Sequence, residues 1–293
     1  MTMILSDIAS RLASGRLSAR DHVESCLAAI DCEDGARAFI TVNAETARKQ
    51  ANRIDKLRSA GAPLPPFAGV TLSVKDLFDI AGEVTTAGSR VLADAKPADR
   101  DATVLARLRA AGFIVIGRTN MTEFAYSGLG MNPHYGNPRS PFGRDQGGGR
   151  VAGGSSSGSA VSICDDMAAA TIGTDTGGST RAPAAFCGIT GMKPTTTRMP
   201  SRGVYPLSAS FDAAGPMAGS VACCAILDDL MTGGEGYEET PFPVSGLRLA
   251  VPRGYLFDDL DPEVAAAFDA AVGRLSAAGA HVTEIRIDIL EDL

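Results

Sequence analysis

Two segments rich in glycine and serine lie where the chain passes between predicted strands and helices. The first is GGSSSGSA, residues 153–160, and the second is GTDTGGSTRAP, residues 173–183. A tract of this composition is usually a flexible linker. Here the flanks favour a folded setting, because SGSAVSICDDM has the pattern of a short helix and AAATIGTD that of a buried strand. The glycines therefore lie at junctions inside a domain, where the backbone can approach another group closely.

Strand-like and helix-like stretches alternate along the chain, which predicts an α/β fold with helices on the faces of a sheet. Ser18 and Asp21 have the spacing of a helix N-cap. An acidic stretch at 233–245 is interpreted as a surface loop inside one domain that spans residues 1–293. The predicted helices are residues 6–13, 19–30, 44–59, 101–112, 122–126, 158–166 and 261–280, and the predicted strands are 39–42, 69–75, 113–117, 168–175, 247–254 and 281–288.

The serine hydroxyls beside glycine backbone indicate acyl-transfer chemistry, in which backbone N–H groups must reach a substrate oxygen. A candidate base is Lys75, which ends the strand-like GVTLSVK. The chain has three histidines, His22, His134 and His281, and none has a setting that marks it as a base. A lysine can act as a base only when it is neutral, which requires burial. We therefore expect apolar and serine-rich neighbours around Lys75.

Composition excludes several other classes of function. The 293 residues are 45% hydrophobic and carry a net charge of −7 with scattered basic residues, which argues against a nucleic-acid surface. No apolar stretch reaches membrane-spanning length, and the N-terminus does not resemble a signal peptide. The glycines match neither a phosphate-binding loop nor a dinucleotide motif. The six cysteines lack metal or disulfide spacing, which predicts buried free thiols in a reducing cytoplasm and no metal or cofactor.

The two glycine and serine segments resemble those of the amidase signature family, whose catalytic groups are serine, cis-serine and lysine. GGSSSGSA resembles the stretch in which a serine follows a cis peptide bond, and GTDTGGSTRAP resembles the stretch that carries the nucleophile. Further similar segments occur in the family's order, and the signature core covers about residues 66–220. These segments are DATVLARLRAAGFIVIGRTNMTEFA from residue 101, FCGITGMKPT from residue 186 and SFDAAGPMA from residue 210.

The resemblance implies a role for each residue of the site. Lys75 would be the neutral base, Ser155 the proton relay after a cis bond, and Ser179 the nucleophile. Asp175 and Arg181 would support the loop through charged hydrogen bonds. The oxyanion hole would be formed by backbone N–H groups of Thr176, Gly177, Gly178 and Ser179.

Composition alone cannot rank Ser155 against Ser156 and Ser157. The family's spacing indicates Ser155, with a cis bond between Gly154 and Ser155. If that bond were trans and another serine contacted Lys75, the relay would move to that serine.

The fold implied by the resemblance is a mixed central β-sheet between helical layers. Family members usually continue well beyond residue 293, so the chain is expected to lack strands at its C-terminal end. Its uncovered sheet edge would then favour a homodimer or a partner chain. Three functions follow: hydrolysis of a small-molecule amide, release of ammonia from glutamine in a tRNA-dependent amidotransferase, or a truncated remnant without catalysis. SGLGMNPHYGNP is more typical of the stand-alone amidases.

Overall fold

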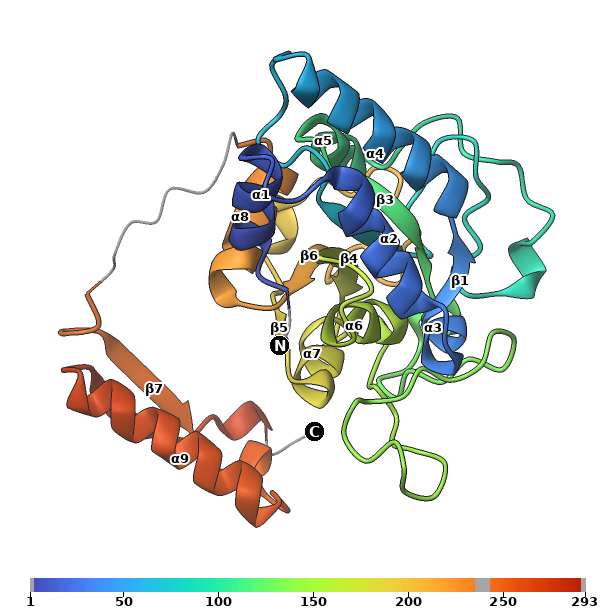
Figure 1. The fold of residues 1–293 in the computed structure, drawn as a ribbon. Helices are drawn as coiled ribbons and strands as arrows, with labels where there is room; N and C mark the ends of the chain where they lie inside the picture. Colours follow the sequence, from blue (N-terminus) through green and yellow to red (C-terminus); the bar gives the residue numbers. More distant parts are fainter. Residues whose placement is uncertain (1–2, 235–242, 291–293) are drawn as a thin grey trace. The chain divides into compact units, whose positions relative to one another are not determined.

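A six-stranded mixed sheet runs through the first of two units into which the computed structural model divides (Figure 1). The units are Met1–Tyr237 and Glu238–Leu293, and the structure describes residues 3–234 and 243–290. The predicted loop at 233–245 lies mostly outside the described residues. The interpretation of residues 1–293 as a single domain stays a prediction.

The strand order of the sheet is β1-β3-β2-β4-β6-β5. β2 runs parallel to both β3 and β4, whereas the other neighbouring pairs are antiparallel. This arrangement confirms the predicted mixed sheet. The strands are β1 (Phe39–Val42), β2 (Thr71–Lys75), β3 (Ile114–Thr119), β4 (Ala170–Asp175), β5 (Thr190–Gly191) and β6 (Ala213–Ala218).

The helices predicted at 19–30 and 44–59 are confirmed with those bounds, and the hydroxyl of Ser18 accepts a hydrogen bond from the Asp21 N–H at 2.9 Å. The short helix predicted at 122–126 is present only as a 3₁₀ helix at Glu123–Ala125, within which Phe124 has a left-handed backbone conformation (φ 51°). The α-helices of the first unit are α1 (Leu5–Ala13), α2 (Ala19–Ile30), α3 (Glu33–Ala38), α4 (Ala44–Ser59), α5 (Thr103–Ala110), α6 (Ser157–Cys164), α7 (Arg181–Cys187) and α8 (Val221–Thr232).

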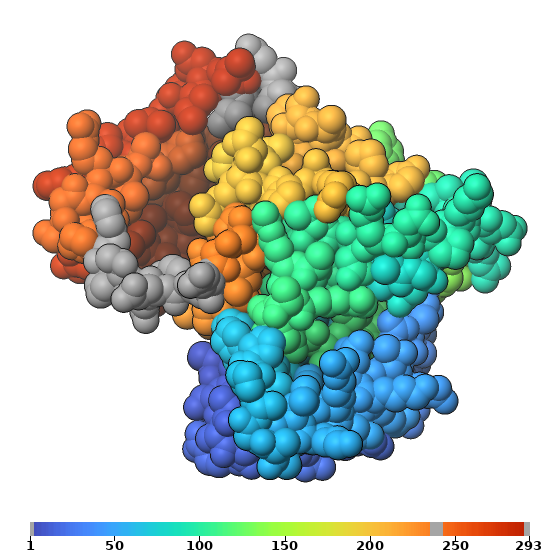
Figure 2. All heavy atoms as spheres, turned by 90° about the horizontal axis from the view of Figure 1, so that it is seen from above, coloured from blue at the N-terminus to red at the C-terminus, as the bar shows by residue number. Residues whose placement is uncertain are grey.

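Helices cover both faces of the sheet and give it two apolar cores. One core joins the sheet to α1, α4, α5 and α8, and the other joins it to α6 and α7. Because side chains alternate along a strand, β2 sends Leu72 and Val74 to the first core. Ser73 and Lys75 point to the opposite face, where Ser73 contacts Ser162 of α6. Figure 2 shows the N-terminal segment, in blue, lying against the green part of the chain near residues 100–120.

The second unit contains the predicted strand, helix and strand. They are β7 (Arg248–Pro252), α9 (Pro262–Ala277) and β8 (His281–Ile285), with the two strands parallel. Among the described residues, no helix combines the length and the apolar character that a membrane crossing requires.

The six cysteines are free thiols, as predicted, but they are not all buried. Cys32 is exposed and Cys164 is half-buried. The prediction of six buried thiols is therefore wrong for these two. Cys32 is exposed because it is the N-cap of α3, where its sulfur accepts a hydrogen bond from the Gly35 N–H.

Gly158 in α6 provides a test of the packing that fixes the start of this helix. A Cβ atom at Gly158 would overlap the carbonyl oxygen of Ala38 and lie 2.7 Å from the backbone nitrogen of Asn120. Alanine in a helix gains up to about 1 kcal/mol over glycine, but overpacking costs about 1–3 kcal/mol. We expect Gly158→Ala to lower the urea midpoint of unfolding.

The matched control is Gly128→Ala, because Gly128 is exposed and a Cβ there would meet no atom within 4 Å. This variant should unfold at the wild-type urea concentration. Equal midpoints for the two variants would show that α6 does not pack closely on residues 38 and 120.

Candidate active site

Lys75 ends β2 with its side chain fully buried, although lysine is among the residues most often exposed. Its Nζ lies 2.7 Å from Ser155 Oγ and 3.0 Å from Thr174 Oγ1. Both partners are neutral hydroxyls. Among the described residues, no carboxylate forms an ion pair with this amine. One of the two is a serine, and the side chain is buried as a neutral lysine requires.

Burial lowers the pKa of Lys75 from 10.5 to about 7, because a charged ammonium loses its hydration in the interior. The negative charges of Asp175 and Asp212 act in the opposite direction and favour the ammonium form. Burial outweighs them. At neutral pH a large fraction of Lys75 is therefore an uncharged amine with a lone pair available for a proton.

Ser155 lies two residues before the first residue of α6, and the backbone around it is held from two sides. The N–H of Thr122 donates to the Ser155 carbonyl oxygen at 3.1 Å, and the Gly154 N–H donates to the Gly128 carbonyl oxygen at 2.7 Å. The peptide bond between Gly154 and Ser155 is cis, as expected. The Ser155 hydroxyl is the one that contacts Lys75.

The two following serines have other surroundings. The Ser156 hydroxyl donates to the carbonyl oxygen of Thr174 at 3.3 Å. The Ser157 hydroxyl is buried and has no hydrogen-bond partner among the residues that the structure describes. Of the three serines that composition could not rank, Ser155 thus lies against the predicted base.

Ser179 follows β4 and is half-buried, whereas Lys75 and Ser155 are completely enclosed. Its carbonyl oxygen accepts a hydrogen bond from the Ser156 N–H at 3.2 Å, which holds the two glycine and serine segments together. Within the described part of the chain, the Ser179 hydroxyl makes no hydrogen bond. The structure therefore brings the backbone of Ser179 next to the Ser155 segment and leaves its hydroxyl without a protein partner.

The Asp175 carboxylate organises the loop that leads to Ser179. It accepts backbone hydrogen bonds from Gly178 at 2.7 Å and Thr180 at 3.1 Å, and it pairs with both Nε and Nη2 of Arg181 at 3.0 Å. Burial would raise the pKa of Asp175, but these hydrogen bonds outweigh it and hold the pKa well below its usual range. Gly178 has φ +130°, a conformation that other residues rarely adopt.

Two residues near the site were not among the predicted ones. Thr174, at the end of β4, is the second hydrogen-bond partner of Lys75. Asp212 accepts a hydrogen bond from the Thr176 hydroxyl. Both lie within the segments quoted for the resemblance, so their positions were available as a signal, but their contacts depend on how β2, β4 and β6 pair.

A cavity of about 310 Å³ adjoins these two residues. The cavity is lined by hydroxyl groups, one carboxylate and apolar side chains. Its lining residues are Thr174, Thr196, Met199, Ser201, Val204, Pro206, Ala209, Asp212 and Ala214.

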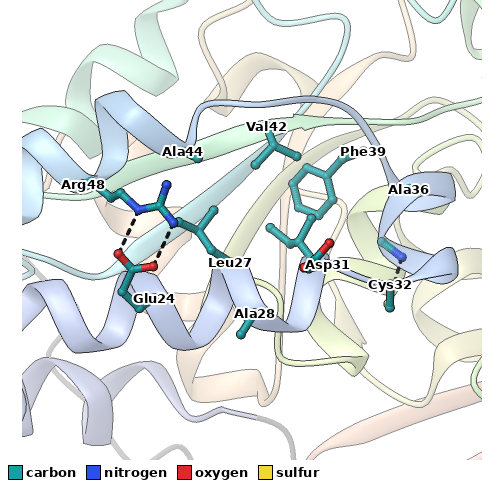
Figure 3. Close-up of a pocket in the computed structure, with 12 residues that line it drawn as sticks. Glu24, Leu27, Ala28, Asp31, Cys32, Ala36, Phe39, Val42, Ala44 and Arg48 are labelled. Atoms are coloured by element: carbon teal, nitrogen blue, oxygen red, sulfur yellow. Dashed lines mark hydrogen bonds and ion pairs between the residues drawn. The ribbon is translucent and has the colours of Figure 1, made fainter.

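A second hollow, of about 520 Å³, contains none of the predicted site residues. Figure 3 shows Leu27, Phe39 and Val42 around it, beside the ion pair between Glu24 and Arg48. This hollow lies between α2, α3, β1 and the start of α4.

The three histidines do not contact the predicted catalytic serines. His22 is buried against the Thr71 hydroxyl at 3.1 Å, and burial lowers its pKa to about 4. His134 Nε2 lies 2.8 Å from Glu123 Oε1, and His281 begins β8. No group of histidine, cysteine and carboxylate side chains within residues 3–234 and 243–290 has the arrangement of a metal site.

Curated relatives share most of this chain but extend further. The chain is 41% identical to 1-carboxybiuret hydrolase subunit AtzE of Pseudomonas sp. (strain ADP), over 92% of its own length and 62% of that protein. It is 39% identical to a Glutamyl-tRNA(Gln) amidotransferase subunit of Roseiflexus sp. (strain RS-1), over 97% of its length and 60% of that protein. The chain therefore spans about three fifths of the length of these relatives.

Solved structures also match most of this chain and extend beyond the matched part. A crystal structure of an amidase matches 97% of this chain with a TM-score of 0.86 and 34% identity, and 63% of that chain is covered. The peptide amidase from Stenotrophomonas maltophilia matches 97% of this chain with a TM-score of 0.83 and 29% identity, and 62% of that chain is covered. The sequence model of the family described as Amidase matches residues 21–293 of this chain. The chain therefore belongs to the amidase signature family.

Proposed function

We propose that this chain hydrolyses a small carboxylic amide to the acid and ammonia or an amine, through an acyl-enzyme on Ser179. The observation that carries the proposal is the fully buried Lys75, whose lowered pKa of about 7 accompanies a 2.7 Å contact with Ser155. A buried amine without a carboxylate partner is unfavourable for folding, and a catalytic base explains its presence.

In the first half of the proposed reaction, the Ser179 hydroxyl attacks the amide carbonyl carbon. Ser155 accepts the proton from Ser179 and passes its own proton to the neutral amine of Lys75. The negative charge on the carbonyl oxygen is stabilised by backbone N–H groups of Thr176, Gly177 and Ser179. The Gly178 N–H, which was predicted from the sequence to join them, instead donates to the Asp175 carboxylate. The proton then returns along the same path to the leaving nitrogen, the C–N bond breaks, and the acyl group remains on Ser179.

In the second half, water enters from the half-exposed side of Ser179. It loses a proton through Ser155 to Lys75 and attacks the acyl carbon. The Ser179 oxygen leaves and recovers that proton, which restores the starting state. Asp175 takes no proton in this scheme, because its hydrogen bonds keep it ionised and fix the loop.

Two kinds of substrate fit this proposal, a free small amide and glutamine. Glutamine is favoured by the similarity to the Glutamyl-tRNA(Gln) amidotransferase subunit, and the 1-carboxybiuret hydrolase relative is also named as a subunit. We therefore include a partner chain in the proposal. A panel of acetamide, propionamide, benzamide and glutamine, followed by ammonia release, separates the two cases. Turnover of glutamine alone would favour the amidotransferase role.

The nucleophile can be identified without a known substrate. A fluorophosphonate probe should label the protein once, and peptide mapping should locate the adduct on Ser179, because this residue is half-exposed and its hydroxyl makes no hydrogen bond to any described residue. Ser179→Ala should abolish the labelling. An adduct on another serine, or equal labelling of the alanine variant, would overturn the assignment.

If Lys75 is the base, the rate at which Ser179 is labelled should depend on pH. The neutral form of Lys75 predominates above its pKa of about 7, so the labelling rate should rise through pH 7 and level off above it. An ordinary lysine would instead require a pH above 10.5. One unit below the pKa, the rate should be about tenfold lower than the plateau.

Lys75→Arg should be inactive at every pH in this range, because a guanidinium does not lose its proton. Substantial activity in this variant would show that Lys75 has a structural or electrostatic role.

The relay can be tested with two serines of the same tract. Ser155→Ala removes the hydroxyl that contacts Lys75 and should slow the labelling of Ser179 by about 10²–10⁴-fold. Ser157→Ala is the matched control, because it removes a buried hydroxyl without a partner and should leave the rate unchanged. A wild-type rate in Ser155→Ala would exclude it as the relay and direct the test to Ser156.

A further inference from the structure

The carboxylate of Asp212 joins two segments that border the candidate active site. One oxygen accepts a hydrogen bond from the hydroxyl of Thr176, the first residue of the loop that ends in Ser179. The other accepts from the backbone N–H groups of Leu207 at 2.8 Å and Ser208 at 2.9 Å. The sequence pattern by itself assigns Asp212 no role.

Sheet pairing explains how Asp212 reaches this loop. Asp212 precedes β6, whose first residue, Ala213, pairs with Asp175 at the end of β4. Because β4 and β6 are antiparallel, the residue before β6 lies beside the residue after β4, which is Thr176. The carboxylate therefore lies where the loop leaves the sheet.

Asp212 also contributes charge to the site. Within the described ranges no arginine or lysine pairs with it, and its carboxylate lines the cavity of about 310 Å³ together with Thr174. Its negative charge raises the pKa of Lys75, as does that of Asp175, which is already paired with Arg181.

A third carboxylate, that of Asp76, has a cationic partner of its own. Asp76 follows Lys75 in the chain, but it pairs with the buried Arg118 at 3.3 Å. Of these three carboxylates, Asp212 is the one whose described hydrogen bonds all come from neutral donors.

We infer that Asp212 is a positioning residue, which holds the glycine loop at Thr176 so that the backbone N–H groups of Thr176, Gly177 and Ser179 point to one place. The inference rests on the proposed function, because that place is where the oxyanion would form. The same carboxylate fixes residues 207 and 208. Loss of the hydrogen bond between Thr176 and Asp212 should therefore slow the reaction of Ser179, although neither side chain contacts the Ser179 hydroxyl. The reason is that small displacements of a catalytic group reduce rates strongly.

The test measures the second-order rate constant for fluorophosphonate labelling of Ser179 in the intact protein. Thr176→Val keeps the backbone N–H and the side-chain size but removes the hydroxyl, and Asp212→Ala removes its acceptor. Both should lower the plateau rate by about 10- to 100-fold. Thr176→Ser should restore it. Thr197→Val is the matched control, because Thr197 is exposed and its side chain has no described hydrogen bond.

Asp212→Asn separates geometry from charge. A rotated amide can donate to the Thr176 hydroxyl and still accept from Leu207 and Ser208, so the plateau rate should be retained. Without the negative charge the pKa of Lys75 should fall further. The rise of the labelling rate with pH should therefore shift to lower pH, an effect that a purely structural residue would not cause.

Wild-type rates in both Thr176→Val and Asp212→Ala would overturn the inference and leave the proposed function intact. If Asp212→Ala does not fold, the inference is tested by comparing Thr176→Val with Thr176→Ser. Equal plateau labelling rates in these two variants would count against the inference. A wild-type protein that is not labelled at Ser179 would overturn the proposed function, and this inference with it.

Discussion

The buried amine of Lys75 is the constraint on which the rest of the site depends. A shift of its pKa from 10.5 to about 7 corresponds to a penalty on the order of 5 kcal/mol for the charged form. That is a large part of the net stability of a typical domain. The two apolar cores on either face of the sheet must offset this cost. Two neutral hydroxyls, from Ser155 and Thr174, provide the polar contacts that the amine retains.

Sheet topology explains why these groups meet. β2 and β4 are parallel neighbours, so their carboxyl ends lie at one edge of the sheet, where sites of α/β proteins commonly form. Lys75 ends one strand and Asp175 the other. The start of α6 supplies Ser155 to the same edge, and the hydrogen bond between Ser156 and Ser179 joins the two glycine and serine segments there.

Local signals predicted much of this arrangement. The cap at Ser18, the helix at 44–59 and the two glycine and serine segments are encoded by neighbouring residues. By contrast, β6 reads AAGPMA, whose glycine and proline are unfavourable in strands. It forms a strand because β4 and β5 flank it. The contacts of Thr174 and Asp212 depend on this pairing, which is long-range, so sequence patterns could not reveal them.

The different exposure of the proposed nucleophile, Ser179, and the proposed base, Lys75, has a chemical consequence. A neutral amine is itself a good nucleophile, and an acyl group transferred to it would form a stable amide that permanently blocks the base. Lys75 has no exposed surface, and Ser155 lies against its nitrogen, whereas Ser179 is open on one side. In the proposed reaction, this enclosure protects the enzyme from self-acylation, because protons can pass between Ser179 and the lysine while an acyl group cannot reach it.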